Sequence, residues 1–163
     1  MKTNQPLKVK FIPELLVYDF DGVMTDNRVL IFQDGTEAVF VNRADGWGVA
    51  QLRKAGFRQI ILSTERNQVV SARAKKLQIE VFQGSIDKAK ELTAYCQTNR
   101  IDLKTVLYVG NDLNDLEAMC LVGCPVAPAD SHPEILKISR HITHTRGGEG
   151  VIKELSEWLL TTI

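Results

Sequence analysis

Two aspartates, Asp19 and Asp21, stand one residue apart where an apolar run ends and a glycine turn begins, in the segment LLVYDFDG of residues 15–22. Residues two apart in an extended chain project to the same side, so both carboxylates belong to one small site. Such charges repel each other and cost folding free energy unless a cation compensates them. Hard oxygen ligands of this kind suit Mg²⁺. The pair therefore predicts a magnesium site; a loop with two solvated acids is the alternative that the same pattern allows.

Phosphoryl transfer is the chemistry for which these side chains, with two others, supply the parts. Asp19 could act as a nucleophile, because a carboxylate can form an acyl-phosphate and divide hydrolysis into two steps. Asp21 could protonate the leaving oxygen and then activate water. Ser63 offers a hydroxyl to a phosphoryl oxygen, and Lys88 offers a charge that neutralises the phosphate and positions Asp19. Taken singly, Ser63 is typical of a helix cap and Lys88 of a solvated helix face.

Oxygen ligands also gather in the segment GNDLND of residues 110–115, directly after a further apolar run. Asn111 or Asp112 in this loop could complete the magnesium shell. Asp115 could serve only as an acid in the first turn of the next helix, where the helix dipole favours negative charge. The order of all these positions, each at a separate predicted strand end, favours a catalytic site over the individual alternatives.

The elements that must position these residues alternate along the chain. Continuous apolar runs predict short strands buried on both faces, at 15–20, 59–62, 106–109 and 125–127. Helical spacing of apolar residues predicts helices at 46–55, 68–77, 88–99, 113–122 and 149–160. This order predicts the α/β class, with one domain over residues 1–163 built as a Rossmann-like three-layer α/β/α sandwich around a parallel sheet. Ligands of such sheets bind beyond the carboxyl ends of the strands.

One segment departs from this alternation. Residues 28–32 and 37–41 are rich in strand formers and flank an Asp-Gly turn, which predicts a projecting hairpin over about 28–41. Its strands carry more apolar residues than a free hairpin needs, and a two-stranded projection is marginal alone. We therefore expect it to pack against the body of the domain or against another subunit.

Composition argues against several classes of function. Twenty Lys and Arg residues balance twenty Asp and Glu residues, which removes the electrostatic case for binding nucleic acid or a membrane surface. No stretch is long and apolar enough to span a bilayer. The lysines of residues 1–10 lack an apolar signal core behind them, so we do not expect export. Cys96, Cys120 and Cys124 form no metal-type or redox pair, and reduced structural thiols fit a cytoplasmic protein.

With its motifs in this order the chain resembles the haloacid dehalogenase superfamily of magnesium-dependent phosphatases over nearly its whole length. The segment DFDGVMTD of residues 19–26 resembles the first motif of that family, Ser63 the second, Lys88 the third and residues 110–115 the fourth. The first motif is highly specific, whereas Ser63 and Lys88 are convincing only in its company.

The resemblance implies a role for each residue of the predicted magnesium site. Asp19 would be the nucleophile and a metal ligand, and Asp21 the acid and base whose backbone carbonyl also binds the metal. Relatives often have an aspartate where Asn111 stands, so the remaining protein ligand would be Asn111 or Asp112. We prefer Asp112, because it is the charged one of the two.

The intervals between the motifs are too short for the cap domain that the superfamily usually inserts. The resemblance is therefore closest to the capless branch, which includes phosphatases of 3-deoxy-octulosonate 8-phosphate and of nine-carbon sugar acids. In that branch the hairpin drives formation of a tetramer, and a neighbouring subunit covers the active site. A non-catalytic oligomerisation module, related to the C-terminal domain of cytidylyl-sialate synthetases, is the alternative of a different class.

The residues after Ser63 bear on the substrate. Octulosonate phosphatases typically have a glycine-arginine pair there, whereas Thr64 and Glu65 resemble the nonulosonate enzymes, and Glu65 could accept hydrogen bonds from sugar hydroxyls. We therefore predict a phosphatase of a phosphorylated 2-keto-3-deoxy sugar acid. The preferred substrate is 2-keto-3-deoxy-nonulosonate 9-phosphate, with 3-deoxy-octulosonate 8-phosphate as the alternative.

Two further pairs are candidates for substrate contact. Arg73 and Lys76 could face the substrate carboxylate of an adjacent subunit, a task that suits Arg, although a solvated basic helix face explains them almost as well. Asn42 and Arg43 follow the hairpin and could contact the substrate. Asp45 could do so too, or could cap the next helix.

Overall fold

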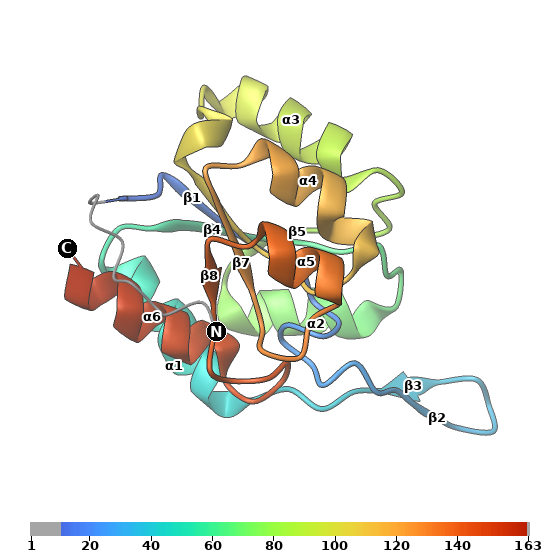
Figure 1. Ribbon diagram of the computed structural model, residues 1–163. Helices are drawn as coiled ribbons and strands as arrows, with labels where there is room; N and C mark the ends of the chain where they lie inside the picture. Colours follow the sequence, from blue (N-terminus) through green and yellow to red (C-terminus); the bar gives the residue numbers. More distant parts are fainter. Residues whose placement is uncertain (1–10, 163) are drawn as a thin grey trace.

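Six parallel strands form the centre of the molecule in the computed structural model, which describes residues 11–162 (Figure 1). Their order across the sheet is β5 (Glu80–Phe82), β4 (Arg58–Leu62), β1 (Leu15–Tyr18), β6 (Val106–Val109), β7 (Cys124–Ala127) and β8 (His141–Ile142). Every pairing in this sheet is parallel, as predicted. The neighbours β4, β1 and β6 therefore end at the same edge.

Helices cover both faces of the sheet and complete the predicted three layers (Figure 1). One face holds α1 (Arg43–Lys54), α2 (Gln68–Leu77) and α6 (Val151–Thr162), and the other holds α3 (Lys88–Asn99), α4 (Leu116–Leu121) and α5 (Pro133–Ile138). Alternate residues of β1 supply both cores: Leu16 packs with the first set of helices and Val17 with the second. A strand buried on both faces is apolar throughout, which explains the continuous runs in the sequence.

Two strands, one α-helix and a 3₁₀ turn, Leu103–Thr105, were missing from the sequence-based prediction, and several boundaries move. β5, β8 and α5 are two to six residues long, too short for a periodic pattern. The predicted helix at 113–122 divides into a 3₁₀ turn, Leu113–Asp115, and α4. Helix α1 begins three residues before the predicted Gly46, because Oδ1 of Asn42 accepts a hydrogen bond from the backbone N–H of Ala44 and caps the helix there.

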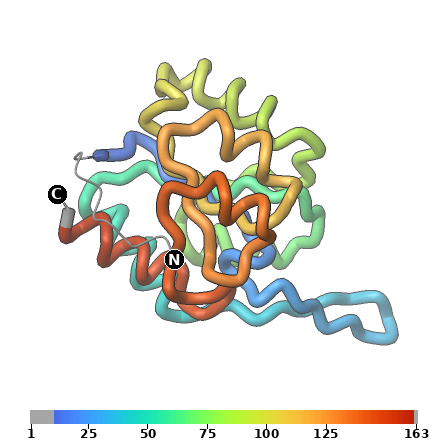
Figure 2. The backbone as a smooth tube through the Cα atoms, viewed as in Figure 1, coloured from blue at the N-terminus to red at the C-terminus, as the bar shows by residue number. Residues whose placement is uncertain are grey.

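The predicted hairpin projects from the body of the domain, with short antiparallel strands β2 (Leu30–Ile31) and β3 (Glu37–Ala38) (Figure 2). Gly35 forms the turn with a φ of 82°, which favours glycine. The apolar side chains of the hairpin are about half exposed or more: Val29, Leu30, Ile31, Phe32 and Phe40. The outer part of the hairpin thus does not bury its apolar surface within its own chain.

Asp45 joins two helices of one layer and does not cap its own helix. Its buried carboxylate accepts hydrogen bonds through Oδ1 from the backbone N–H groups of Ile152, at 2.8 Å, and Lys153, at 3.1 Å. These amides lie in the first turn of α6 and have no partner within the helix. Burial raises the pKa of Asp45 to about 6. The expectation that Asp45 contacts substrate is therefore replaced by a structural role.

No helix within residues 11–162 has the length and apolar character needed to cross a bilayer. Cys96, Cys120 and Cys124 are free thiols, in agreement with the sequence-based expectation. The lysines of residues 1–10, on which the expectation about export depended, lie outside the described residues.

Candidate active site

A cleft of about 520 Å³ opens at the carboxyl ends of β1, β4 and β6, beside the base of the hairpin. These three strands are neighbours in the sheet, so the loops that follow them meet in space although they are far apart in sequence. The cleft is lined by Asp19, Asp21, Thr64 and Glu65, by residues 111–114, and from the hairpin side by residues 27–29, Glu37 and Val39. The sequence-predicted motifs thus come together at one place.

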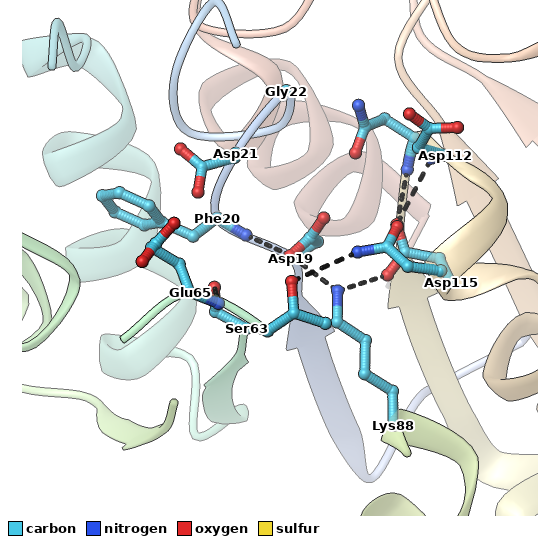
Figure 3. Close-up of polar contacts among 12 residues, drawn as sticks. Asp19, Phe20, Asp21, Gly22, Ser63, Glu65, Lys88, Asp112 and Asp115 are labelled. Carbon is cyan, nitrogen blue, oxygen red and sulfur yellow. Dashed lines mark hydrogen bonds and ion pairs between the residues drawn. The ribbon is translucent and has the colours of Figure 1, made fainter. Parts of the chain in front are cut away.

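Asp19, which lines this cleft, belongs to a buried ion-pair cluster (Figure 3). The Nζ of Lys88 lies 2.7 Å from Oδ1 of Asp19 and 2.7 Å from Oδ1 of Asp115. All three side chains are at most 5% exposed, so Lys88 does not lie on a solvated helix face. Burial, helped by the charge of Asp115, raises the pKa of Asp19 to about 8 although Lys88 opposes the change. Burial alone would lower the pKa of Lys88, but the two carboxylates outweigh it and raise that pKa.

Asp115, which the sequence indicated only as an acid in the first turn of a helix, makes further contacts in the structure. Besides Lys88, it accepts hydrogen bonds from the Tyr108 hydroxyl at 2.9 Å and, through Oδ2, from the backbone N–H of Asn111 at 2.9 Å. A Cβ on Gly110 would lie 2.7 Å from this carboxylate, so the tight turn depends on glycine. Asp115 therefore fixes both Lys88 and the loop after β6. The signal that could have found it is the repeated Asn-Asp spacing of GNDLND.

The side chain of Asn111, and not that of Asp112, reaches the predicted magnesium site. Its amide group lies 2.9 Å from the carbonyl oxygen of Asp21 and 3.2 Å from Oδ2 of Asp19. With its nitrogen facing them, Asn111 donates a hydrogen bond to each; with its oxygen facing them, three oxygens converge and need a cation between them. Asp112 is exposed, and its Oδ1 accepts a hydrogen bond from the backbone N–H of Leu113. The geometry therefore favours Asn111 over the residue that we preferred from sequence.

This donor set fits a hard divalent cation that keeps water ligands. It combines a carboxylate oxygen of Asp19, the carbonyl of Asp21 and the amide oxygen of Asn111. Within residues 11–162, no three His, Cys, Asp or Glu side chains are grouped in a way that could hold a metal ion. A cation there would be bound by few protein ligands and by water, as Mg²⁺ usually is.

Asp21 lies at the mouth of the site on the turn that follows β1 (Figure 3). Burial raises the pKa of its carboxyl group, and the charges of Glu65 and Glu37 raise it further. The hydrogen bond that Oδ1 accepts from the Thr25 hydroxyl lowers this pKa but does not outweigh the burial. A raised pKa favours the protonated form that a general acid needs. Gly22 has a φ of 80°, and a Cβ there would lie 2.0 Å from Nδ2 of Asn111, so only glycine permits this approach.

Ser63 directly follows β4 and is almost fully buried. Its Oγ accepts a hydrogen bond from the backbone N–H of Glu65 at 3.1 Å. It does not cap α2, since Asn67 does so by accepting from the backbone N–H of Val69. The alternative role of Ser63, as the cap of a helix, is thus taken by Asn67.

The remaining candidates for substrate contact do not line the cleft of their own chain. Arg73 is half-buried and donates a hydrogen bond through Nη2 to the carbonyl oxygen of Asn42 at 2.9 Å. Asn42 caps α1, whereas Arg43 and Lys76 are exposed on α1 and α2. Within one chain the structure places these four residues around the amino end of α1 and on α2, away from Asp19.

Known proteins resemble this chain in both sequence and architecture. Residues 50–155 match the model of the haloacid dehalogenase-like hydrolases. The chain is 33% identical to the 3-deoxy-D-manno-octulosonate 8-phosphate phosphatase of Yersinia pestis, over 90% of this chain and 79% of that protein.

Two solved structures superpose closely on the fold. A hydrolase of the haloacid dehalogenase family from Streptomyces avermitilis is 47% identical, with a TM-score of 0.91, over 95% of this chain and 89% of that one. The 3-deoxy-D-manno-octulosonate 8-phosphate phosphatase of Moraxella catarrhalis, solved with magnesium, phosphate and its sugar acid, is 28% identical, with a TM-score of 0.90 over 94% and 88%. Sequence, fold and arrangement of motifs agree, and the chain belongs to the haloacid dehalogenase-like hydrolase family.

Proposed function

We propose that this protein is a magnesium-dependent phosphatase of a phosphorylated 2-keto-3-deoxy sugar acid. The observation that carries the proposal is the meeting of Asp19, Lys88 and Asp115 with the Asp21 carbonyl and the Asn111 amide at one sheet edge. The solved relative that holds magnesium, phosphate and a sugar acid supports it. An intact buried charge cluster, which costs desolvation free energy, argues against the alternative of a non-catalytic module.

The reaction proceeds in two steps through Asp19. A carboxylate oxygen of Asp19 forms a bond to phosphorus while the bond from phosphorus to the sugar oxygen breaks, and Asp21 gives its proton to that oxygen. Asp21, now a carboxylate, takes a proton from water as the water oxygen attacks phosphorus and releases Asp19. Lys88 holds Asp19 in place and offsets its charge. Bound magnesium would neutralise the phosphoryl charge.

Two substrates of this class are supported by different observations. Thr64 and Glu65 line the cleft, and these residue types after Ser63 favour the nonulosonate 9-phosphate. Two of the relatives named above, those of Yersinia pestis and Moraxella catarrhalis, are named as phosphatases of the octulosonate 8-phosphate, which favours the shorter sugar acid.

Phosphate release from the two sugar acid phosphates, measured side by side, tests this proposal. With Mg²⁺ present we expect turnover of at least one, with kcat/KM at least about tenfold above that for an aryl phosphate, because a few added hydrogen bonds give that factor. Addition of EDTA should abolish release, and Mg²⁺ should restore it. Absence of turnover on both substrates would overturn the assignment of the substrate class. Turnover that survives EDTA would overturn the assignment of metal dependence.

We also propose that the protein is a homotetramer with its active sites at subunit interfaces. The apolar residues of the hairpin support this, because they stay about half exposed or more within residues 11–162 and the base of the hairpin lines the cleft. Light scattering should give the mass of four chains. Ile31→Asp with Phe40→Asp should lower that mass, since charges replace the apolar contact. Ile86→Asp, on a side chain outside the hairpin that is even more exposed, should not. A monomeric wild type would refute the assembly.

A further inference from the structure

One amide side chain ties the inner strand of the hairpin to the body of the domain. Nδ2 of Asn67, at the start of α2, donates a hydrogen bond of 2.7 Å to Oε2 of Glu37 on β3. The two residues are thirty positions apart in the chain, and both line the catalytic cleft. A two-residue strand pair is marginal by itself, so this contact helps to set where the hairpin wall of the cleft stands.

Asn67 also contacts a second carboxylate, through its backbone and not through its side chain. Its backbone N–H donates to Oε1 of Glu65 at 3.0 Å, and the backbone N–H of Arg66 donates to the same oxygen at 2.6 Å. Oδ1 of Asn67 meanwhile accepts from Val69 and caps α2. The backbone N–H, Oδ1 and Nδ2 of Asn67 thus each form a hydrogen bond. The rotamer of the Asn67 side chain is determined both by the cap of α2 and by the bond to Glu37.

Each of the two carboxylates accepts hydrogen bonds through one of its oxygens, and its other oxygen is available to a ligand. Within residues 11–162, Oε1 of Glu37 and Oε2 of Glu65 accept no hydrogen bond. Both side chains line the cleft that contains Asp21, and the apolar Val39 and Val69 line it beside them. A carboxylate accepts hydrogen bonds and donates none, so this part of the wall suits a ligand rich in hydroxyl groups on a carbon chain.

We propose that Asn67 is a positioning residue which holds Glu37 at a fixed place through its side-chain amide, and that this carboxylate, beside Glu65, accepts hydrogen bonds from the hydroxyl groups of the substrate. The hairpin then takes part in recognising the substrate through Glu37. The inference rests on the proposed function, because it assigns the hydroxyl-bearing portion of the phosphorylated substrate to this wall of the cleft.

The Asn67→Asp variant separates the positioning role of Asn67 from its role as the cap of α2. Aspartate caps a helix as well as asparagine does, so the bond from Val69 is kept. The donor to Glu37 is lost, however, and two carboxylates then face each other. We expect the ratio of kcat/KM for the sugar acid phosphate to kcat/KM for an aryl phosphate to fall about tenfold, mainly through KM, because hydrogen bonds to charged groups are worth about that factor.

Two further variants make the test specific. In Asn67→Asp with Glu37→Gln the amide and the carboxylate exchange places, so the introduced glutamine can donate to the introduced aspartate, and the ratio should return to within about threefold of wild type. Gln68→Glu adds the same charge one residue further along α2, on an exposed side chain outside the cleft, and should leave the ratio at the wild-type value.

An alditol phosphate, which has hydroxyl groups but no carboxylate or ketone, distinguishes failure of this inference from failure of the proposed function. If wild type turns over neither sugar acid phosphate but prefers the alditol phosphate to the aryl phosphate, and Asn67→Asp loses that preference, the substrate class is wrong and the hydroxyl site stands. If a sugar acid phosphate is preferred and Asn67→Asp keeps the preference, the function stands and this inference fails. A wild type without preference for any hydroxyl-rich phosphate overturns the inference as well.

Discussion

Asp19→Asn is expected to abolish phosphate release while the domain remains folded. The amide cannot attack phosphorus, so turnover should fall by about 10⁴-fold or more, the order found when a covalent nucleophile is removed. The free energy of unfolding should be unchanged or higher at neutral pH, because burial raises the pKa of Asp19 to about 8 and makes its charge costly there. The amide oxygen of the new side chain can still accept the hydrogen bond from Lys88. Phosphate release and urea denaturation measure both quantities.

Asp112→Asn is the matched comparison for this variant. It makes the same chemical change on a neighbouring carboxylate of the cleft, but Asp112 is exposed and its contact is with the backbone of Leu113. We expect a loss of less than about tenfold, since an Asn can cap the same turn. Full activity of Asp19→Asn would contradict the mechanism. A loss for Asp112→Asn as large as that for Asp19→Asn would restore Asp112 as the metal ligand in place of Asn111.

Lys88→Met should reduce both activity and stability. The variant keeps a side chain of similar length but leaves the buried carboxylates of Asp19 and Asp115 facing each other without a cation. Removal of one partner from a buried ion pair typically costs about 3–5 kcal/mol, and the free energy of unfolding at pH 7 should fall by about that amount. Turnover should fall by about 10²–10³-fold, the usual effect of removing one electrostatic contact at the reacting group.

The pH dependence of the Lys88→Met variant has a definite sign. Lys88 lowers the pKa of Asp19, so its removal raises that pKa further above the value in the unfolded chain. The folded variant then binds more protons than the unfolded chain between about pH 4 and 8, and its free energy of unfolding falls as the pH rises through that range. The wild type shows the same fall below about pH 8, because the pKa of its Asp19 is already raised to about 8, and the two proteins differ above that pH. Urea denaturation at pH 7 and pH 9 should therefore show a larger deficit of the variant relative to wild type at pH 9.

A double variant separates charge repulsion from loss of packing. Asp115→Asn in the Lys88→Met background removes one of the two facing carboxylates. The oxygen of the introduced amide can still accept the hydrogen bond from the backbone N–H of Asn111, and its nitrogen can donate to the Tyr108 hydroxyl oxygen. Stability should recover in part, whereas activity should not, because Asp19 still lacks its cation. If Lys88→Met unfolds like wild type at pH 7, or if the double variant is less stable than the single one, the cluster is not the charge-compensated unit inferred from the distances.

The sequence determined which elements form and where the chemistry lies. Continuous apolar runs specify strands buried on both faces, and parallel strands place their carboxyl ends at one edge. Asp19, Ser63 and the loop of residues 110–115 follow such strands directly. Local pattern was therefore sufficient to predict the four central strands, most helices and the edge at which the motifs meet. It failed for β5, β8 and α5, because two to six residues hold less than a full period of any pattern.

Only the tertiary structure decided which side chains meet at that edge. Charge alone favoured Asp112 as a ligand, but the tight turn after β6 directs Asn111 toward Asp19. Asp115 joins Lys88 in the interior, and Asn67 reaches across thirty residues to Glu37. Each of these contacts depends on turn geometry and on packing between segments that are distant in sequence. A sequence pattern specifies the face of an element, whereas the partner of a side chain depends on the position of the neighbouring element.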